Sequence, residues 1–303
     1  MQNRVLITGG SGLVGKHLSK LLSSNGFKVS HLGRNKSSLS ETYTKYVWDP
    51  IRGEIDSDAI INTDYIIHLA GAGVEAQRWT EQYKKEIYDS RIISTRLLVE
   101  SVIKYNPNGI KKLVSTSAIG VYGNHTAKNA TENTPPGNTF LAKVCTDWEK
   151  EAIALRQYGV PVSIIRTGVV LAKEGGFIPK IAAPIKLFAG TALGTGNQYL
   201  SWVHIEDLCN MYLYLIRNEN LNGEYNGVSL EPVTHNHVTR QMAERLHRPL
   251  IIPNAPVFVL KLLFGEMHTM LIASQHISGK KWVNEKFTFK YPDIASALAN
   301  LLP

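Results

Sequence analysis

The stretch Arg4-Val5-Leu6-Ile7-Thr8-Gly9-Gly10-Ser11-Gly12-Leu13-Val14-Gly15 decides the fold of this chain. A short β-rich run enters a glycine-rich turn, and apolar residues then recur at helical spacing. This order of strand, turn and helix typically holds a dinucleotide pyrophosphate at the helix N-terminus. Gly9 permits the tight turn, Gly12 lets the backbone approach the phosphates, and Gly15 allows the helix to pack close to the strand. The residues expected to contact a nucleotide here are Thr8, Gly9, Ser11, Gly12, Leu13, Val14 and Gly15.

Strand-like and helix-like segments alternate through the first half of the chain. We expect strands at 4–7, 28–32, 46–48, 65–69, 112–117 and 162–166, and long helices at 80–105 and 140–158. Such alternation predicts an α/β fold of the Rossmann type, a doubly wound parallel sheet covered by helices on both faces. Ligands of these sheets bind at the carboxyl ends of the strands.

After residue 167 the helix and strand patterns become less regular, because prolines and glycines interrupt them. A loop-rich segment is therefore expected before residue 199. A strand is expected at 199–203, and helices are expected at 207–216, 238–246, 257–263 and 293–302. We therefore expect a nucleotide-binding domain at 1–170, to which residues 199–218 return. Residues 171–303 are expected to form a smaller C-terminal substrate lobe.

The composition argues against several classes of partner. The net charge is +8, but the 33 Lys and Arg residues are spread along the chain, so no nucleic-acid partner is expected. No apolar run is long enough to span a bilayer and the first strand follows Met1 closely, so neither a membrane partner nor a signal peptide is expected. The two cysteines, Cys145 and Cys209, predict no disulfide framework and a cytoplasmic location. No residue spacing predicts a metal site.

The end of the second strand predicts the choice of cofactor. An enzyme that selects NAD usually carries an Asp or Glu there, which binds the ribose 2′-hydroxyl. This chain instead reads Leu32-Gly33-Arg34-Asn35. A guanidinium can hold a 2′-phosphate by charge-assisted hydrogen bonds. We therefore expect NADP(H), with Arg34 as the main residue that binds its 2′-phosphate. Asp49, at the end of the third strand, either contacts the adenine or only forms the turn before Pro50.

Three further segments resemble the extended short-chain dehydrogenases/reductases. Residues 68–73, His-Leu-Ala-Gly-Ala-Gly, are similar to their adenine-side loop, which implies cofactor contacts from Leu69, Ala70 and Gly71. Residues 115–123, Ser-Thr-Ser-Ala-Ile-Gly-Val-Tyr-Gly, resemble the active-site strand of sugar-nucleotide epimerases and dehydratases. Residues 201–208, Ser-Trp-Val-His-Ile-Glu-Asp-Leu, resemble the segment where the substrate lobe rejoins the nucleotide domain. Other segments point to an atypical branch, the epimerase family proteins of unassigned substrate with a small C-terminal domain.

The chain departs from this family at the catalytic positions. Active members use a Tyr four residues before a Lys, and the Lys charge lowers the Tyr pKa so that its phenol exchanges a proton with the substrate. Alignment on Glu149 puts Leu141 at the Tyr place and Cys145 at the Lys place, and neither side chain can do this work. The remaining candidates for proton transfer are Ser117, Tyr122 and water, although a packing role is the more common one for a buried Tyr such as Tyr122.

Two functions remain open at this stage. The resemblance implies an NADP(H)-dependent oxidoreductase or nucleotide-sugar epimerase acting on a small molecule that the sequence does not identify. The missing Tyr and Lys favour the alternative, a non-catalytic sensor or scaffold that responds to NADP(H). Arg91, Arg166 and His204 could bind an anionic substrate or serve as structural partners. Related proteins dimerise through the helix that corresponds to 80–105, which implies a homodimer.

Overall fold

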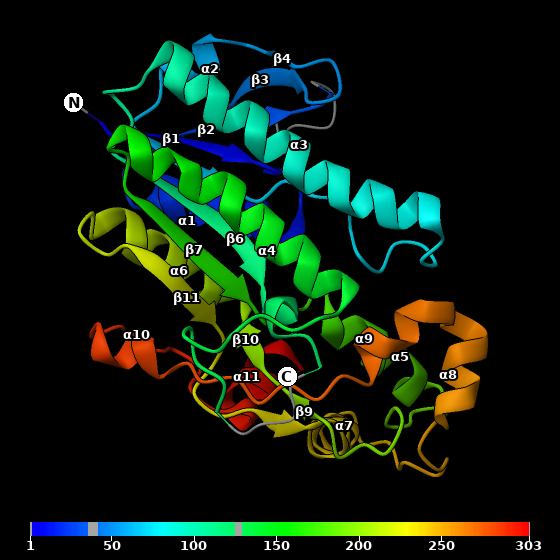
Figure 1. Cartoon of the computed structure of the whole chain (residues 1–303). Helices are drawn as coiled ribbons and strands as arrows, with labels where there is room; N and C mark the ends of the chain where they lie inside the picture. The colour runs from blue at the N-terminus through cyan, green and yellow to red at the C-terminus, as the bar shows by residue number, and fades with distance from the viewer. Residues whose placement is uncertain (1, 36–41, 125–128, 303) are drawn as a thin grey trace.

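The computed structural model describes residues 2–35, 42–124 and 129–302 and contains an eight-stranded sheet. The strand order is β11-β7-β6-β5-β1-β2-β3-β4, and every neighbouring pair is parallel except β3 and β4 (Figure 1). The predicted Rossmann-type sheet is therefore confirmed. Its strands are β1 (Arg4–Thr8), β2 (Lys28–Gly33), β3 (Thr44–Asp49), β4 (Glu54–Ile55), β5 (Tyr65–His68), β6 (Lys112–Ala118), β7 (Val162–Thr167) and β11 (Gly223–Gly227).

Helices cover both faces of this sheet (Figure 1). Side chains of β1 alternate between the two faces, as expected for a strand. Val5 and Ile7 pack in the core shared with α1 and α6, whereas Leu6 packs in the core shared with α2, α3 and α4. These helices are α1 (Leu13–Ser24), α2 (Asp58–Ile61), α3 (Glu81–Tyr105), α4 (Phe140–Ile153) and α6 (Ile205–Arg217).

The strand order reverses at β1, which has β2 on one side and β5 on the other. The connections after β1 and β5 therefore leave the sheet in opposite directions. This divergence opens a crevice at the carboxyl ends of the two strands, the place where open α/β sheets bind ligands.

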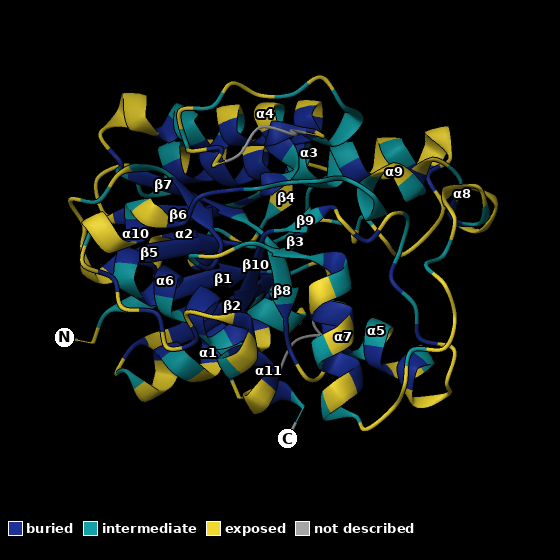
Figure 2. Cartoon of the chain, turned by 90° about the horizontal axis from the view of Figure 1, so that it is seen from below, coloured by how far each residue is buried: buried dark blue, intermediate teal, exposed yellow. Residues whose placement is uncertain are grey.

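The C-terminal lobe packs below the carboxyl edge of the sheet in Figure 1 and has its own buried core in Figure 2. Its core is built mainly from α5, α7 and α11, with Trp202 fully buried among them. The helices are α5 (Phe177–Lys186), α7 (His235–Arg245), α8 (Val257–Phe264), α9 (His268–Leu271), α10 (Lys280–Asn284) and α11 (Ile294–Leu301). The short strands are β8 (Val169–Leu171), β9 (Tyr199–Leu200), β10 (Trp202–His204) and β12 (Val233–Thr234). Short 3₁₀ turns lie at Ile119–Tyr122, Ala154–Tyr158 and Gly265–Met267.

Several boundaries differ from the sequence expectations. The helix expected at 140–158 is α-helical only to Ile153, and the strand expected at 199–203 is split into β9 and β10. Helix α5 lies in the segment expected to be loop-rich. The return to the first domain also continues beyond residue 218, because β11 joins the sheet edge and Trp282 packs 4.9 Å from Tyr225 between ring centroids. These contacts connect positions distant in sequence, so local periodicity did not predict them.

Among the described residues, no helix is both long and apolar enough to cross a bilayer.

Candidate functional site

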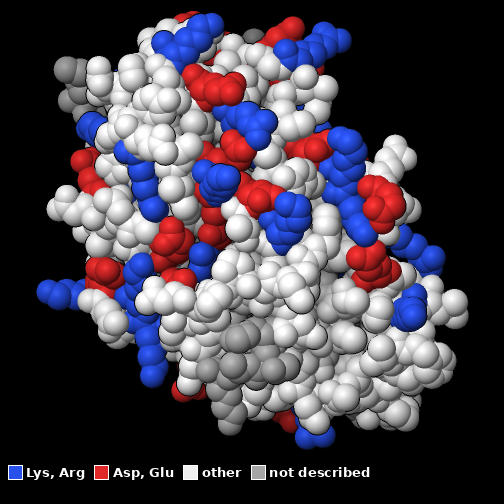
Figure 3. Space-filling view, viewed as in Figure 1, with Lys and Arg blue, Asp and Glu red and all other residues white. Residues whose placement is uncertain are grey.

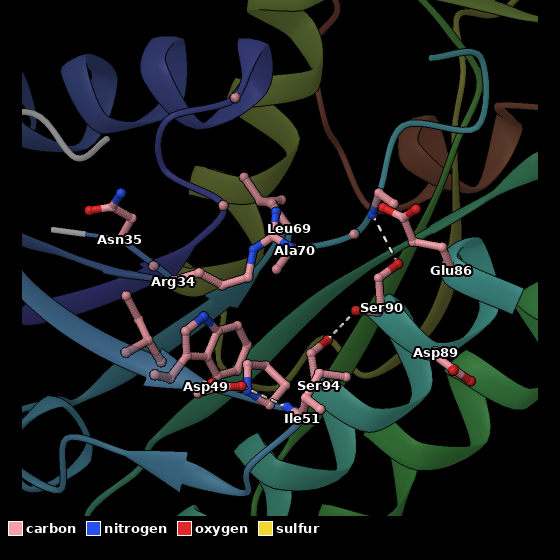
Figure 4. Close-up of a pocket in the computed structure, with 18 of the residues that line it drawn as sticks. Arg34, Asn35, Asp49, Ile51, Leu69, Ala70, Glu86, Asp89, Ser90 and Ser94 are labelled. Atoms are coloured by element: carbon pink, nitrogen blue, oxygen red, sulfur yellow. Dashed lines mark hydrogen bonds between the residues drawn. The ribbon is translucent and has the colours of Figure 1, made fainter. Parts of the chain in front are cut away.

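A cleft of about 970 Å³ lies at the carboxyl ends of β1, β2, β3 and β5, with α3 along its far side (Figure 4). Of the residues predicted to bind a cofactor, its lining includes Gly9, Ser11, Gly12, Arg34, Asp49, Leu69, Ala70 and Gly71. The structure therefore brings together four segments that are far apart in sequence. Thr8, Leu13, Val14 and Gly15 do not line the cleft.

The glycine-rich turn leaves the start of α1 open to an anion. Gly9 has φ +71°, a left-handed conformation that favours glycine, and its carbonyl accepts a hydrogen bond from the Gly12 amide at 3.0 Å. Gly12 is the N-cap of α1, no side chain caps this end, and the first turn contains no acidic residue. The unpaired backbone amides and the positive end of the helix dipole are the features that bind phosphate. Leu13 and Val14 can contribute only their backbone amides.

The glycines of the turn serve different purposes. A Cβ atom at Gly12 would meet only the Gly9 carbonyl oxygen, at 3.3 Å, so space remains beside it. A Cβ atom at Gly15 would lie 2.5 Å from the same oxygen, so Gly15 permits packing against the turn itself. Gly10 is required for a reason that sequence analysis missed, since a Cβ there would lie 2.6 Å from the His31 ring.

Thr8 lies beneath the cleft and holds the loop after β5 in place. Its hydroxyl oxygen accepts hydrogen bonds from the Leu69 and Ala70 amides, at 3.1 and 3.2 Å. The same hydroxyl is 2.7 Å from Nδ1 of His68, whose Nε2 is 2.9 Å from the Thr95 hydroxyl. Burial lowers the pKa of His68 to about 3, so its ring is neutral at pH 7. Thr8 and His68 thus tie the loop after β5 to β1.

Arg34 extends across the cleft toward Leu69 and Ala70 (Figure 4). The residue is exposed, and its guanidinium forms no ion pair with a carboxylate of the described chain. A cation on the cleft wall without an acidic partner is suited to bind a phosphate.

Asp49 also lines the cleft, but it is engaged locally. Its Oδ1 accepts hydrogen bonds from the amides of Ile51 and Arg52, at 3.0 and 3.2 Å. This geometry is that of a turn former, one of the two roles expected from the sequence. Ile51 is 77% exposed and faces the cleft, where it offers apolar surface to a base.

Ser117 and Tyr122, the candidates for proton transfer, lie in a buried polar network away from the cleft lining. The Ser117 hydroxyl donates to Oε1 of Glu149 at 2.7 Å, and the Tyr122 hydroxyl donates to Oδ1 of Asn226 at 2.6 Å. Arg166 joins the two, with a hydrogen bond to the Tyr122 oxygen at 3.0 Å and a two-point ion pair to Glu149 at 2.9 and 3.0 Å. Burial raises the pKa of Tyr122 to about 12.

Leu141 and Cys145 are the residues that sequence alignment predicts at the places of the family's Tyr and Lys. The surroundings of Leu141 are apolar, whereas Cys145 also lies near the ionisable side chains of Arg91 and Glu149. Leu141 packs against a cluster that includes Trp79 and Met267. Cys145 is buried, and burial raises the pKa of its thiol to about 11. Neither position supplies an acid, a base or a cation.

The three residues weighed for an anionic substrate have different environments. Arg166 is paired with Glu149, and His204 stacks on Tyr291 with a ring-centroid distance of 3.8 Å. Arg91, on α3, lies directly behind Gly71, since a Cβ at Gly71 would be 3.2 Å from the guanidinium carbon. Only Arg91 is therefore next to the cleft without an acidic partner among the described residues.

Comparisons with known proteins agree with this geometry. Residues 5–227 match the model of the NAD dependent epimerase/dehydratase family, and residues 255–301 match a domain of unknown function, DUF1731. Epimerase family protein YfhF of Bacillus subtilis is 33% identical over 299 residues, a match that covers 98% of this chain and 97% of that protein.

Two solved structures extend the likeness. Human epimerase family protein SDR39U1, crystallised with NADPH, superposes with a TM-score of 0.88 at 26% identity and covers 99% of both chains. A nucleoside-diphosphate sugar epimerase of Corynebacterium glutamicum superposes with a TM-score of 0.80 at 30% identity. That match covers all of this chain and 58% of the other.

Proposed function

The chain belongs to the NAD dependent epimerase/dehydratase family, as its motifs predicted, and on this premise we propose that it binds NADPH in the cleft between β1 and β5. The turn at Gly9–Gly12 would hold the pyrophosphate on the open end of α1. Arg34 would bind the 2′-phosphate, and Ile51 would cover the adenine. The human relative crystallised with NADPH supports the same choice of cofactor.

The single observation that carries this proposal is the environment of Arg34. A carboxylate after β2 would favour the ribose 2′-hydroxyl of NADH and repel a phosphate. Arg34 instead presents a guanidinium without a described ion-pair partner to the cleft. NADPH should therefore bind more tightly than NADH.

We propose further that NADPH binding serves a sensor or scaffold function and does not support the proton chemistry of the epimerases. Bound NADPH would supply a hydride. This chain, however, has Leu141 and Cys145 in the places of the proton-transferring pair. The hydroxyls of Ser117 and Tyr122 both donate to internal acceptors, so neither is free to give a proton to a substrate.

An oxidoreductase that takes its proton from water is the second candidate function. The observation in its favour is Arg91, which keeps a positive charge beside the cleft in the absence of the lysine. The small-molecule substrate and the homodimer implied by the resemblance also stay proposals. Sedimentation of the purified protein should give the mass of a dimer, and a monomer at all concentrations would contradict that part.

The test combines binding with turnover. Calorimetry should show NADPH binding to the wild-type protein, and NADPH absorbance should stay constant when carbonyl compounds and nucleotide sugars are added. Steady oxidation of NADPH with any of these compounds would contradict the sensor function and support the oxidoreductase function. A lack of NADPH binding would contradict the proposed function altogether.

A further inference from the structure

Arg91 occupies a defined place at the junction of α3 and the loop after β5. Its Nη1 donates to the Ile87 carbonyl oxygen and its Nη2 to the Ala72 carbonyl oxygen, both at 2.9 Å. The guanidinium carbon lies 5.1 Å from the centre of the Trp148 ring. These contacts fix the position of the charge, because both ends of the planar guanidinium are held.

The charge of Arg91 is not compensated by the part of the chain that the structure describes. No described carboxylate forms an ion pair with it, unlike Arg96 five residues later on α3, which is paired with Glu151. The ionisable neighbours His68, Cys145 and Tyr83 are neutral at pH 7, since burial lowers the pKa of His68 and raises those of Cys145 and Tyr83. A partly buried cation among neutral groups is stabilised when an anion binds next to it.

The indole of Trp148, beside Arg91, is a donor without a hydrogen-bond partner among the described residues. Trp148 is 4% exposed. Buried indole N–H groups usually find an acceptor. The hydrogen bonds of Arg91 itself go to backbone carbonyl oxygens, those of Ile87 and Ala72. The region therefore combines one unpaired donor with an uncompensated positive charge, which suits an anionic ligand.

The position of Arg91 relative to the cleft indicates which part of a dinucleotide it would meet. Arg34 follows β2, on one side of β1, whereas Arg91 lies behind Gly71 after β5, on the other side. A cofactor with its adenine half between Arg34 and the Leu69–Ala70 end of the loop after β5, and its pyrophosphate at Gly9–Gly12, would extend its nicotinamide half past Gly71 toward Arg91.

We propose that Arg91 is the cation that positions the nicotinamide-ribose half of NADPH, an inference that rests on the proposed function. It acts through the Gly71 backbone, which it supports from behind, and through its charge on the adjoining pyrophosphate and ribose. A cysteine side chain carries no positive charge in either protonation state, so Cys145 on α4 supplies no cation there and the charge comes from Arg91 on α3.

The test compares two ligands that share only the adenine half. NADPH fills the whole cleft, whereas adenosine 2′,5′-bisphosphate reaches only from Arg34 to the glycine turn. Calorimetry with Arg91→Gln should show NADPH affinity reduced roughly tenfold to a hundredfold, the range for loss of a charged hydrogen bond, with bisphosphate affinity unchanged. Arg91→Lys should keep most of the NADPH affinity because it retains the charge. Arg96→Gln, which removes a charge from the same helix, should bind both ligands like the wild type.

Three results would overturn the assignment. Equal losses for both ligands in Arg91→Gln would show that Arg91 only holds the loop in place. A loss in Arg91→Lys as large as in Arg91→Gln would show that the carbonyl bonds matter and the charge does not. Unchanged NADPH affinity in both variants would remove Arg91 from the site. Failure of the wild type to bind either ligand would instead contradict the proposed function.

Discussion

The Thr8 hydroxyl lies 2.7 Å from Nδ1 of His68, and this contact joins β1 to β5 below the cleft. The Thr8 oxygen accepts from the Leu69 and Ala70 amides, and its proton can satisfy Nδ1 of His68. Nε2 of His68 then carries the proton and donates to Thr95, whose hydroxyl donates to the Arg91 carbonyl. The arrangement requires a neutral His68, so protonation of the ring breaks it.

Acid should therefore destabilise the protein through His68. Its folded-state pKa of about 3 is below the ordinary value near 6.5, so the unfolded chain binds more protons between these values. The free energy of unfolding should fall by about 2 kcal/mol between pH 7 and pH 5 on account of this one group. Urea unfolding at both pH values checks this against His68→Gln, which cannot titrate. An equal pH dependence in the two proteins would contradict the assignment.

Two glycines of the turn should respond differently to substitution. Gly12→Val should change thermal stability little but abolish NADPH binding, because its Cβ would meet only the Gly9 carbonyl oxygen, at 3.3 Å, and its methyl groups would occupy the proposed pyrophosphate site. Gly15→Ala should lower the melting temperature, because its Cβ would lie 2.5 Å from the Gly9 carbonyl oxygen. Thermal unfolding and calorimetry together separate the two effects. A folded Gly12→Val protein that binds NADPH normally would contradict the pyrophosphate site.

The buried network should prove structural. Arg166→Met leaves the Glu149 carboxylate buried without its partner, which should cost about 3–5 kcal/mol of unfolding free energy. Tyr122→Phe should cost about 1–3 kcal/mol, because Arg166 and Asn226 each lose a hydrogen bond. Chemical unfolding measures both. Tyr122→Phe could instead lose NADPH affinity without any loss of stability. That result would contradict the structural role and show that Tyr122 acts in cofactor binding.

Charged groups are mixed over the upper part of the molecule in Figure 3, around α3 and α4. Several are paired within the chain, as Arg96 is with Glu151 and Lys143 with Asp147. A homodimer through α3 would have to form across these pairs, so it should weaken as salt is raised. Sedimentation at two ionic strengths checks this, and a dimer insensitive to salt would contradict an interface on this face.

Much of the fold could be predicted from sequence because the signals were local. The Arg4–Gly15 stretch contains a strand, its turn and the start of a helix, and period-two or helical patterns marked most other elements of the sheet domain. The same locality explains why Arg34 and Gly12 could be expected at a common site, since each follows the carboxyl end of a strand.

The remainder depended on contacts between distant segments. Nothing around Ser117 in the sequence shows that its hydroxyl binds Glu149, or that Tyr122 is engaged by Arg166 and Asn226. The requirement for Gly10 arises from His31 on the neighbouring strand, and strand β11 is recognisable only when paired with β7. These features are set by tertiary packing, which a single sequence does not display.

The most direct test of the account is a calorimetric comparison of NADPH and NADH on the wild type and Arg34→Ala. The wild type should prefer NADPH. Arg34→Ala should lose roughly tenfold to a hundredfold of its NADPH affinity and almost none of its NADH affinity, because only NADPH carries the 2′-phosphate. A wild type that prefers NADH, or equal losses of both cofactors in Arg34→Ala, would contradict the central claim that this cleft selects NADPH through Arg34.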